Sequence, residues 1–213
     1  MGIGHLAVGF AAKRAVPRVS LAVLLFAAAF VDVLWGLFVL IGLEHARTQP
    51  GATRAMPFDL YDYPISHSLL GGILWALLFG GIFFAVKHYR AGAVMLGFVV
   101  LSHWVLDVIS HRPDMPVFLK GPYLGLGLWN SVPASIIVEE GMLAAGVYLY
   151  VKATHSGANL GLGVLVAVLS VMGVVGYLAP PPPSATPLAA GNLILPIVLI
   201  FAATAIDRRR ATA

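Results

Sequence analysis

The run VSLAVLLFAAAFVDVLWGLFVLIGL, Val19–Leu43, decides the fold class, because Asp32 is the only charged side chain in it. A helix that crosses the hydrocarbon core of a membrane needs roughly 20 mainly apolar residues, and this run is long enough. The sequence therefore predicts an all-α, polytopic membrane helical bundle with about six transmembrane helices. The five further segments of similar length and composition are Ile65–Val86, Ala91–Ser110, Val132–Val151, Leu160–Ala179 and Ala189–Ile206.

The composition agrees with a protein whose solvent is lipid. Of the 213 residues, 60% are hydrophobic and 10% are charged, whereas soluble domains carry about 25% charged residues. The chain has no cysteine, which excludes disulfides and thiolate metal sites. The net charge of +4 comes from basic residues that flank apolar segments, so we expect a lipid bilayer as partner and no nucleic acid.

A shorter apolar stretch, Gly4–Val16, precedes the first span and is too short to cross the membrane. We expect it to form a half-helix that enters the bundle from one side. A cleaved signal peptide, with a cleavage site at Ala27–Ala29, is the alternative. The apolar run continues to Leu43, well beyond the roughly 7–15 residues of a signal core, which favours an uncleaved first span.

The distribution of lysine and arginine predicts the orientation, because cytoplasmic loops carry an excess of both residues. With the N-terminus inside and six alternating spans, nine basic residues face the cytoplasm and four face outward. We therefore expect a multi-pass membrane protein with both termini cytoplasmic and the long loops Glu44–Pro64 and His111–Ser131 outside. The inner residues are Lys13, Arg14, Arg18, Lys87, Arg90, Lys152, Arg208, Arg209 and Arg210, and the outer ones are Arg47, Arg54, Arg112 and Lys120.

The chain shows no internal repeat and no domain boundary, so residues 1–213 are expected to form a single membrane domain. Residues 1–153 contain the charged groups that fall inside spans and form the predicted metal-site bundle. Residues 160–206 contain none and are expected to form two scaffolding helices. The sequence carries no signature of the oligomeric state.

A triplet of polar residues in the third span is the strongest sign of chemistry. An ionisable side chain at the centre of a membrane helix costs about 2.5–3.5 kcal/mol, so such residues need a reason to be there. His103, Asp107 and His111 are spaced four residues apart and therefore share one helix face. Imidazole and carboxylate ligands suit zinc, manganese or iron. The alternative is a hydrogen-bonded helix pair in which Asp107 only orients the histidine.

Three further polar residues on other segments are candidates for the same site. His67, within Ser66-His67-Ser68, begins the second span at the depth of the triplet, although an interfacial histidine bonded to water would read the same way. Asp32 lies near the middle of the first span, where a lone carboxylate must be protonated or paired; a proton relay is its alternative role. His5, on the half-helix, is placed to reach Asp32, unless the N-terminus lies at the surface.

Glu139 and Glu140 are adjacent in the fourth span, so their side chains point about 100° apart on a helix. At most one of them can face the site squarely. We favour Glu139, four residues after Ser135, as a ligand or general base. The other glutamate would pair with a backbone or hydroxyl group.

The order of these elements resembles the bacterial family of inner-membrane-bound, metal-dependent hydrolases, the group that includes a LexA-binding inner-membrane protein. The resemblance covers roughly residues 1–150 and implies a hydrolase with a metal site in the bacterial cytoplasmic (inner) membrane. It rests on Gly4-His5-Leu6, Asp32, Ser66-His67-Ser68 and His103-Trp-Val-Leu-Asp107.

The chain is also similar, more distantly, to zinc-dependent phospholipase C, which binds a zinc cluster through an ordered set of histidines and carboxylates. That similarity implies that His5, Asp32, His67, His103 and Asp107 are metal ligands, with His111 in the next place. Ser135 stands where that family has a histidine before Glu139. We therefore expect one or two ions rather than a full three-metal cluster.

The predicted function is metal-assisted hydrolysis, with zinc as the first choice of divalent cation. His67, His103 and Asp107 would hold the cation, and Asp32 or Glu139 would accept a proton. The substrate would be a phosphoester or ester, as a small molecule or a lipid, entering from the outer side. A proton- or ion-coupled transporter and a non-enzymatic membrane scaffold are the alternatives. The confinement of polar residues to the outer half argues against a transporter, because a transport path needs access from both sides.

Overall fold

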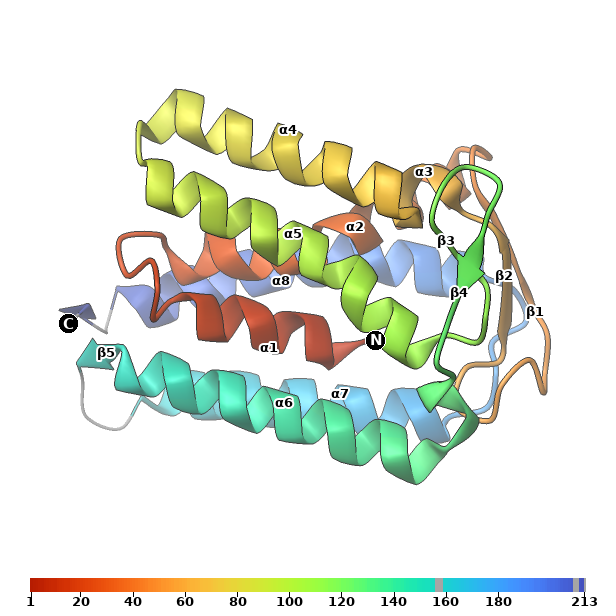
Figure 1. Ribbon diagram of the computed structural model, residues 1–213. Coiled ribbons are helices and arrows are strands. Elements are labelled where there is room, and N and C mark those ends of the chain that lie inside the picture. The colour runs from red at the N-terminus through yellow and green to blue at the C-terminus, as the bar shows by residue number, and fades with distance from the viewer. Residues whose placement is uncertain (156–158, 209–210, 213) are drawn as a thin grey trace.

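The computed structural model describes residues 1–155, 159–208 and 211–212. Within these residues, six helices are long and apolar enough to cross a membrane, and they lie side by side in one bundle (Figure 1). This confirms the predicted all-α, polytopic helical bundle. The six helices are α2 (Leu21–Leu40), α4 (Leu69–Lys87), α5 (Arg90–Ser110), α6 (Val132–Lys152), α7 (Leu160–Leu178) and α8 (Thr186–Asp207).

The predicted second span is wrong in one detail, because a break near its start divides it into two helices. The short helix α3 (Pro64–His67) ends at Ser68, whose backbone is extended. The Ser68 hydroxyl then accepts a hydrogen bond from the Gly71 amide at 2.9 Å and caps α4. A serine in this position satisfies an amide that the helix itself leaves free. The break turns His67 and the helix that carries it away from the axis of α4.

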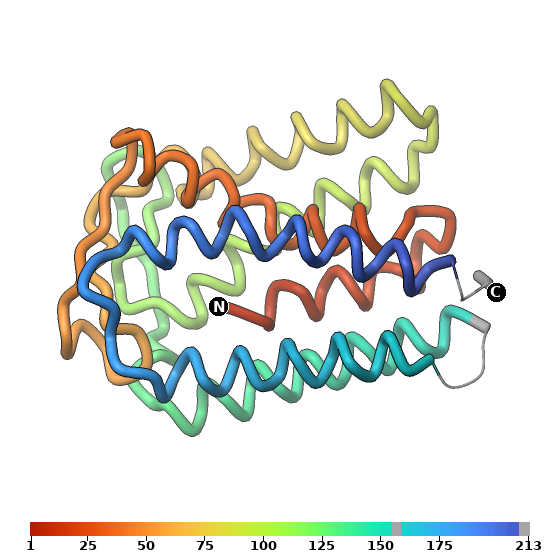
Figure 2. The backbone as a smooth tube through the Cα atoms, turned by 180° about the vertical axis from the view of Figure 1, so that it is seen from behind, coloured from red at the N-terminus to blue at the C-terminus, as the bar shows by residue number. Residues whose placement is uncertain are grey.

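The short N-terminal helix α1 (Ile3–Ala12) lies inside the bundle, between α5 and α6 (Figure 1). Most of its residues are buried, including Phe10, which has no exposed surface. Figure 2 shows the N-terminus at mid-length of the long helices rather than at either end of the bundle. The predicted half-helix is therefore present, and its N-terminus brings His5 to the interior.

Glycine residues allow close approaches between helices, and two of the closest are to backbone atoms of a neighbouring helix. A Cβ atom added to Gly146 of α6 would lie 2.3 Å from the Ala7 carbonyl oxygen of α1. The same addition to Gly36 of α2 would lie 2.5 Å from the Ala189 oxygen of α8. Small residues let the backbones of membrane helices approach closely. The resulting van der Waals contacts stabilise the pair, because the hydrophobic effect does not drive helices together within lipid.

Two small antiparallel hairpins cover one end of the bundle, and we call this end the loop end. The first hairpin pairs β1 (His45–Thr48) with β2 (Phe58–Asp62), and the second pairs β3 (Met115–Pro116) with β4 (Tyr123–Leu124). The single-turn helix η1 (Leu128–Asn130) follows β4. Figure 1 shows both hairpins at the same end as α3. The long loops of the sequence thus form an ordered layer.

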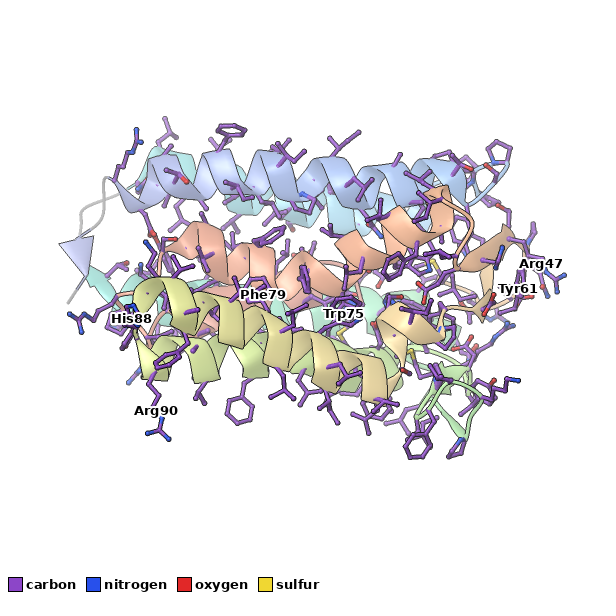
Figure 3. All side chains as sticks on the ribbon, turned by 90° about the horizontal axis from the view of Figure 1, so that it is seen from above. Arg47, Tyr61, Trp75, Phe79, His88 and Arg90 are labelled. Atoms are coloured by element: carbon purple, nitrogen blue, oxygen red, sulfur yellow. The ribbon has the colours of Figure 1, made fainter. Side chains whose placement is uncertain are left out.

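The opposite end carries the C-terminal region, where β5 (Thr154–His155) pairs with β6 (Ala211–Thr212). Figure 3 shows Arg47 and Tyr61 at the loop end and His88 and Arg90 at the other end, with Trp75 and Phe79 in the bundle between them. The predicted cytoplasmic residues Arg209 and Arg210 lie outside the described residues. The main apolar core fills the part of the bundle away from the loop end. Its fully or almost fully buried residues include Phe10, Leu24, Leu25, Leu96, Val100 and Leu143.

Candidate metal centre

Asp107 of α5 is the centre of a buried polar cluster. Its Oδ2 atom lies 3.2 Å from Nε2 of His103, one turn earlier on the same helix, and 3.7 Å from Nε2 of His67. Its Oδ1 atom lies 3.1 Å from Nε2 of His5 and 3.9 Å from Nε2 of His111. The Met1 nitrogen also donates a hydrogen bond to Oδ1. The two oxygens of one carboxylate therefore face two different sets of nitrogen atoms.

Asp32 of α2 supplies the second carboxylate of the cluster. Its Oδ1 atom lies 3.7 Å from Nε2 of His103 and 3.9 Å from Nε2 of His67. The rings of His5 and His103 stack with their centroids 3.6 Å apart. Asp32 meets His67 and His103 rather than His5, which contacts Asp107.

All six residues that the sequence singles out as metal ligands thus meet at one place, from α1, α2, α3, α5 and the end of α5. Two triplets of donor atoms stand out, and within each triplet all atoms lie within 4.8 Å of one another. One triplet is His5, His103 and Asp107, and the other is Asp32, His67 and His103. His111 belongs to neither triplet, although its Nε2 atom faces Asp107. The helix break at Ser68 and the insertion of α1 are the two features that make this convergence possible.

The protonation of His103 tests whether these residues fit a cation. Its Nδ1 atom lies 3.3 Å from the Ala28 carbonyl oxygen, which can only accept, so Nδ1 carries the hydrogen. In the neutral ring the lone pair is then on Nε2, which is buried and has no hydrogen-bond partner among the described residues. This lone pair faces carboxylate oxygens of Asp107 and Asp32. The Met1 nitrogen donates to the other oxygen of Asp107, so the described residues leave Nε2 of His103 without a donor of its own beside the two carboxylates.

The spacing of these atoms is also right for a shared ion. Nitrogen and oxygen ligands bind zinc at about 2.1 Å, which places two tetrahedral ligands roughly 3.4 Å apart. The distances between the imidazole nitrogens and the carboxylate oxygens run from 3.1 to 3.9 Å. The donor set and its spacing therefore fit a divalent cation.

His111 is held in place by groups of the loop end. Its Nδ1 atom lies 2.9 Å from Oδ1 of Asp114 and 3.3 Å from the Tyr63 hydroxyl. Burial, together with the nearby negative charge of Asp114, raises the pKa of Tyr63 well above its usual range, so the phenol keeps its proton. Arg112 pairs with Asp114 and with the buried Asp59 of β2. This chain of charges connects the first hairpin to the cluster.

Glu139 is buried, but it is occupied by contacts outside both donor triplets. Its carboxylate accepts hydrogen bonds from the amides of Gly2, at 3.0 and 3.2 Å, and of Gly4, at 3.1 Å. The Tyr177 hydroxyl of α7 donates a third hydrogen bond to it. Glu139 therefore caps the N-terminus of α1, where a negative charge is favourable. Glu140 accepts a hydrogen bond from the Ser170 hydroxyl at 2.6 Å, as expected for the glutamate outside the site.

A cavity of about 110 Å³ adjoins the cluster. Asp32, His67, Asp107 and His111 contribute its polar surface, and further walls come from residues that the sequence did not single out. Tyr63 and Trp129 come from the loop end, and Leu188 and Asn192 come from α8. The cavity is also lined by Met1, Gly2, Trp35, Met56 and Leu60.

The two C-terminal helices, predicted to be scaffolding, also place residues near the cluster. Tyr177 of α7 contacts Glu139, and Asn192 of α8 lines the cavity. Both residues are uncharged, so a search for membrane-buried charges passed over them. A polar amide in an otherwise apolar segment was the available signal for Asn192.

Comparison of the chain with protein-family models, with curated proteins and with solved structures gives no match. The resemblance in the order of motifs stays a prediction.

Proposed function

We propose that this protein is a membrane-embedded, metal-dependent hydrolase. The observation that carries the proposal is the convergence of four imidazole Nε2 atoms on Asp107, beside Asp32 and a cavity of about 110 Å³. Buried ionisable groups in a membrane bundle usually mark a functional site, because they are costly to keep.

One or two divalent ions are the proposed cofactor, with zinc as the first choice. His67, His103 and Oδ2 of Asp107 would hold one ion, with Asp32 beside it. His5 and His111 would hold a second ion at Oδ1 only if it replaced the Met1 nitrogen, which donates a hydrogen bond to that oxygen. A bound divalent cation supplies Lewis acidity and lowers the pKa of its water to about 7. The histidine and carboxylate donors agree with this choice, because many catalytic zinc sites are built from those ligands.

Asp32 is the favoured proton acceptor of the two predicted catalytic carboxylates. Its side chain keeps 32% of its surface exposed, whereas that of Asp107 keeps 2%. Because Asp32 lines the cavity, it can contact a water or a substrate there. Glu139 has both oxygens occupied by the α1 amides and Tyr177. We therefore infer that Glu139 acts mainly by holding α1.

The proposed substrate is a phosphoester or ester, which includes the headgroup of a lipid. The cavity has room for a group of that size but not for an acyl chain, which would stay in the bilayer. Entry from the outer side follows if the loop end faces outward, as the distribution of basic residues predicts.

The apolar core argues against a proton- or ion-coupled transporter. Between the cluster and the opposite end, the described interior is filled by fully or almost fully buried side chains such as Phe10, Leu96 and Leu143. An ion path would need polar groups or water along that route. A hydrolase needs access from one side only.

Elemental analysis of the purified protein tests the metal site directly. Wild type should contain about one or two equivalents of a divalent metal, and Asp107→Asn should lose most of it, because ligand loss removes the shared centre. Asp62→Asn is the matched control, since Asp62 pairs with His45 in an exposed hairpin at the loop end. Equal metal in Asp107→Asn and in wild type would refute the site. Hydrolysis of a chromogenic phosphodiester and of phospholipid vesicles then tests the reaction.

A further inference from the structure

Glu44, in the connection between α2 and β1, is a fully buried carboxylate at the loop end. Its Oε1 atom accepts hydrogen bonds from the amides of Ile65 and Ser66, at 2.7 and 2.8 Å. These amides belong to α3, the short helix that carries His67. Glu44 therefore caps the N-terminus of that helix, although it precedes the helix by about 20 residues in the chain.

The second oxygen of Glu44 continues the contact to the side chain of Ser66. The Oε2 atom lies 2.5 Å from the Ser66 hydroxyl, which is itself 2.7 Å from Nδ1 of His67. An ionised carboxylate can only accept, so the hydroxyl hydrogen points to Glu44. Burial raises the pKa of Glu44, whereas the hydrogen bonds from the Ser66 hydroxyl and from the amides of Ser66 and Ile65 oppose that shift by favouring the ionised form. The hydroxyl oxygen is left as an acceptor for His67.

The direction of these hydrogen bonds decides which nitrogen of His67 carries the proton. Since the Ser66 oxygen accepts, Nδ1 of the neutral ring must donate, and the lone pair is on Nε2. Nε2 is the atom that lies 3.7 Å from Oδ2 of Asp107 and 3.9 Å from Oδ1 of Asp32. The lone pair is therefore directed to the point where a cation would bind.

We propose that Glu44 is a positioning residue that, through Ser66, fixes His67 as the Nδ1–H tautomer and so makes Nε2 a metal ligand. The value of this tautomer for metal binding rests on the proposed function. Carboxylates that orient metal-binding histidines typically change metal affinity 10–100-fold when they are mutated. Here a serine hydroxyl lies between the carboxylate and the imidazole.

A purely structural role for Glu44 makes a different prediction. If Glu44 only caps α3, its replacement lowers stability but leaves the proton of His67 where it was. Glu44→Gln separates the two roles, because the amide oxygen can still accept from Ile65 and Ser66. The amide nitrogen can only donate to the Ser66 hydroxyl, which must then donate to Nδ1 and move the His67 hydrogen to Nε2.

The tautomer is measured by ¹⁵N–¹H correlation spectra of the metal-free protein labelled with ¹⁵N-histidine in detergent micelles. The His67 signals are assigned by their loss in His67→Asn. Zinc affinity is measured on the same samples by competition with a chelator. Asp62→Asn is the control, because it removes a carboxylate from a histidine at the same end of the bundle, away from the cluster.

We expect the Nδ1–H tautomer at His67 in wild type and in Asp62→Asn, and the Nε2–H tautomer in Glu44→Gln with a 10–100-fold lower zinc affinity. Ser66→Thr should keep the wild-type tautomer and Ser66→Ala should lose its preference, which tests the relay with Glu44 intact. An Nε2–H tautomer in wild type, or no change of tautomer in Glu44→Gln, would overturn the proposal. Because the spectra need no metal, failure of wild type to bind zinc would overturn the proposed function and leave the tautomer result to decide the role of Glu44.

Discussion

The substitution Gly146→Ala should disturb both the fold and the metal centre, because it acts on the contact between α6 and α1. The added Cβ would lie 2.3 Å from the Ala7 carbonyl oxygen and 2.9 Å from its carbon, which are backbone atoms and cannot rotate away. An ordinary contact begins at 3.4 Å, so the helices must separate by 3.4 − 2.3, or about 1 Å. Overpacking of this kind costs up to about 3 kcal/mol.

Gly141→Ala is the matched control for this prediction, since it makes the same change in the same helix with nothing within 4 Å of the new atom. Any change in helix propensity cancels between the two variants. The difference of about 3 kcal/mol corresponds to roughly 6–12 °C in the unfolding midpoint, at about 2–4 °C per kcal/mol for a chain of this size. Thermal unfolding in detergent, followed by circular dichroism, measures it.

The same variant should also weaken zinc binding, because Ala7 lies two residues from His5 on α1. A displacement of about 1 Å is well above the roughly 0.2 Å tolerance of metal–ligand distances. We expect at least a 10-fold loss of zinc affinity in Gly146→Ala and none in Gly141→Ala. Equal midpoints in the two variants would contradict the close approach of α1 and α6. Unchanged zinc affinity in a destabilised Gly146→Ala would show that the position of His5 does not matter to the site.

Three further outcomes follow from the geometry of the cluster. Asp32→Asn should keep bound metal but lower hydrolysis of a phosphodiester by about 10²–10⁴-fold, the usual contribution of a general base; parallel loss of metal and activity would make Asp32 a ligand only. Asp114→Asn should lower zinc affinity 10–100-fold, because it releases Nδ1 of His111, and calorimetry with Asp62→Asn as control would detect this. Removal of metal with a chelator should lower the unfolding midpoint. Zinc at 100 times its dissociation constant should raise the free energy of unfolding by about 2.7 kcal/mol, which is roughly 5–11 °C in the midpoint. A midpoint that does not change with zinc would contradict binding to the folded state.

The spans and the convergence of the ligands could be predicted because each follows from a large local penalty. A run such as Val19–Leu43 cannot be solvated by water, so its length and apolar composition identify a span. Asp32, His103 and Asp107 are costly in lipid, so residues on separate spans are expected to meet. The structure places their polar atoms 3.2 to 3.7 Å apart.

The loop end and the supporting contacts could not be predicted in the same way. Glu44 reads as an ordinary loop residue, because its partners are backbone amides and a hydroxyl 21 and 22 residues later in the chain. The sequence favours Glu139 as a ligand or general base, whereas in the structure it caps α1, and that contact depends on where the helix enters the bundle. A contact to a backbone amide cannot be predicted from residue types, because almost every residue has that donor. A charged residue inside an apolar segment, in contrast, is visible in the sequence.

The count of donors and acceptors favours the proposed metal site over the scaffold interpretation, in which the cluster only bonds helices together. Polar groups that join membrane helices pair a donor with an acceptor. Here the Nδ1 hydrogen of His103 is directed to the Ala28 carbonyl, and Nδ1 of His67 is bound to the Ser66 hydroxyl. With the proposed tautomer of His67, both rings present lone pairs at Nε2 to the carboxylates of Asp32 and Asp107.

Acceptors that face acceptors in a medium of low dielectric repel one another unless a positive charge lies among them. A proton shared by one imidazole would satisfy one contact and leave the other imidazole facing both carboxylates. A divalent cation accepts electron pairs from both rings and both carboxylates at once, at the spacing that they already have. The arrangement of hydrogen bonds around the cluster, more than the residue types within it, is therefore what distinguishes a metal centre from a set of helix contacts.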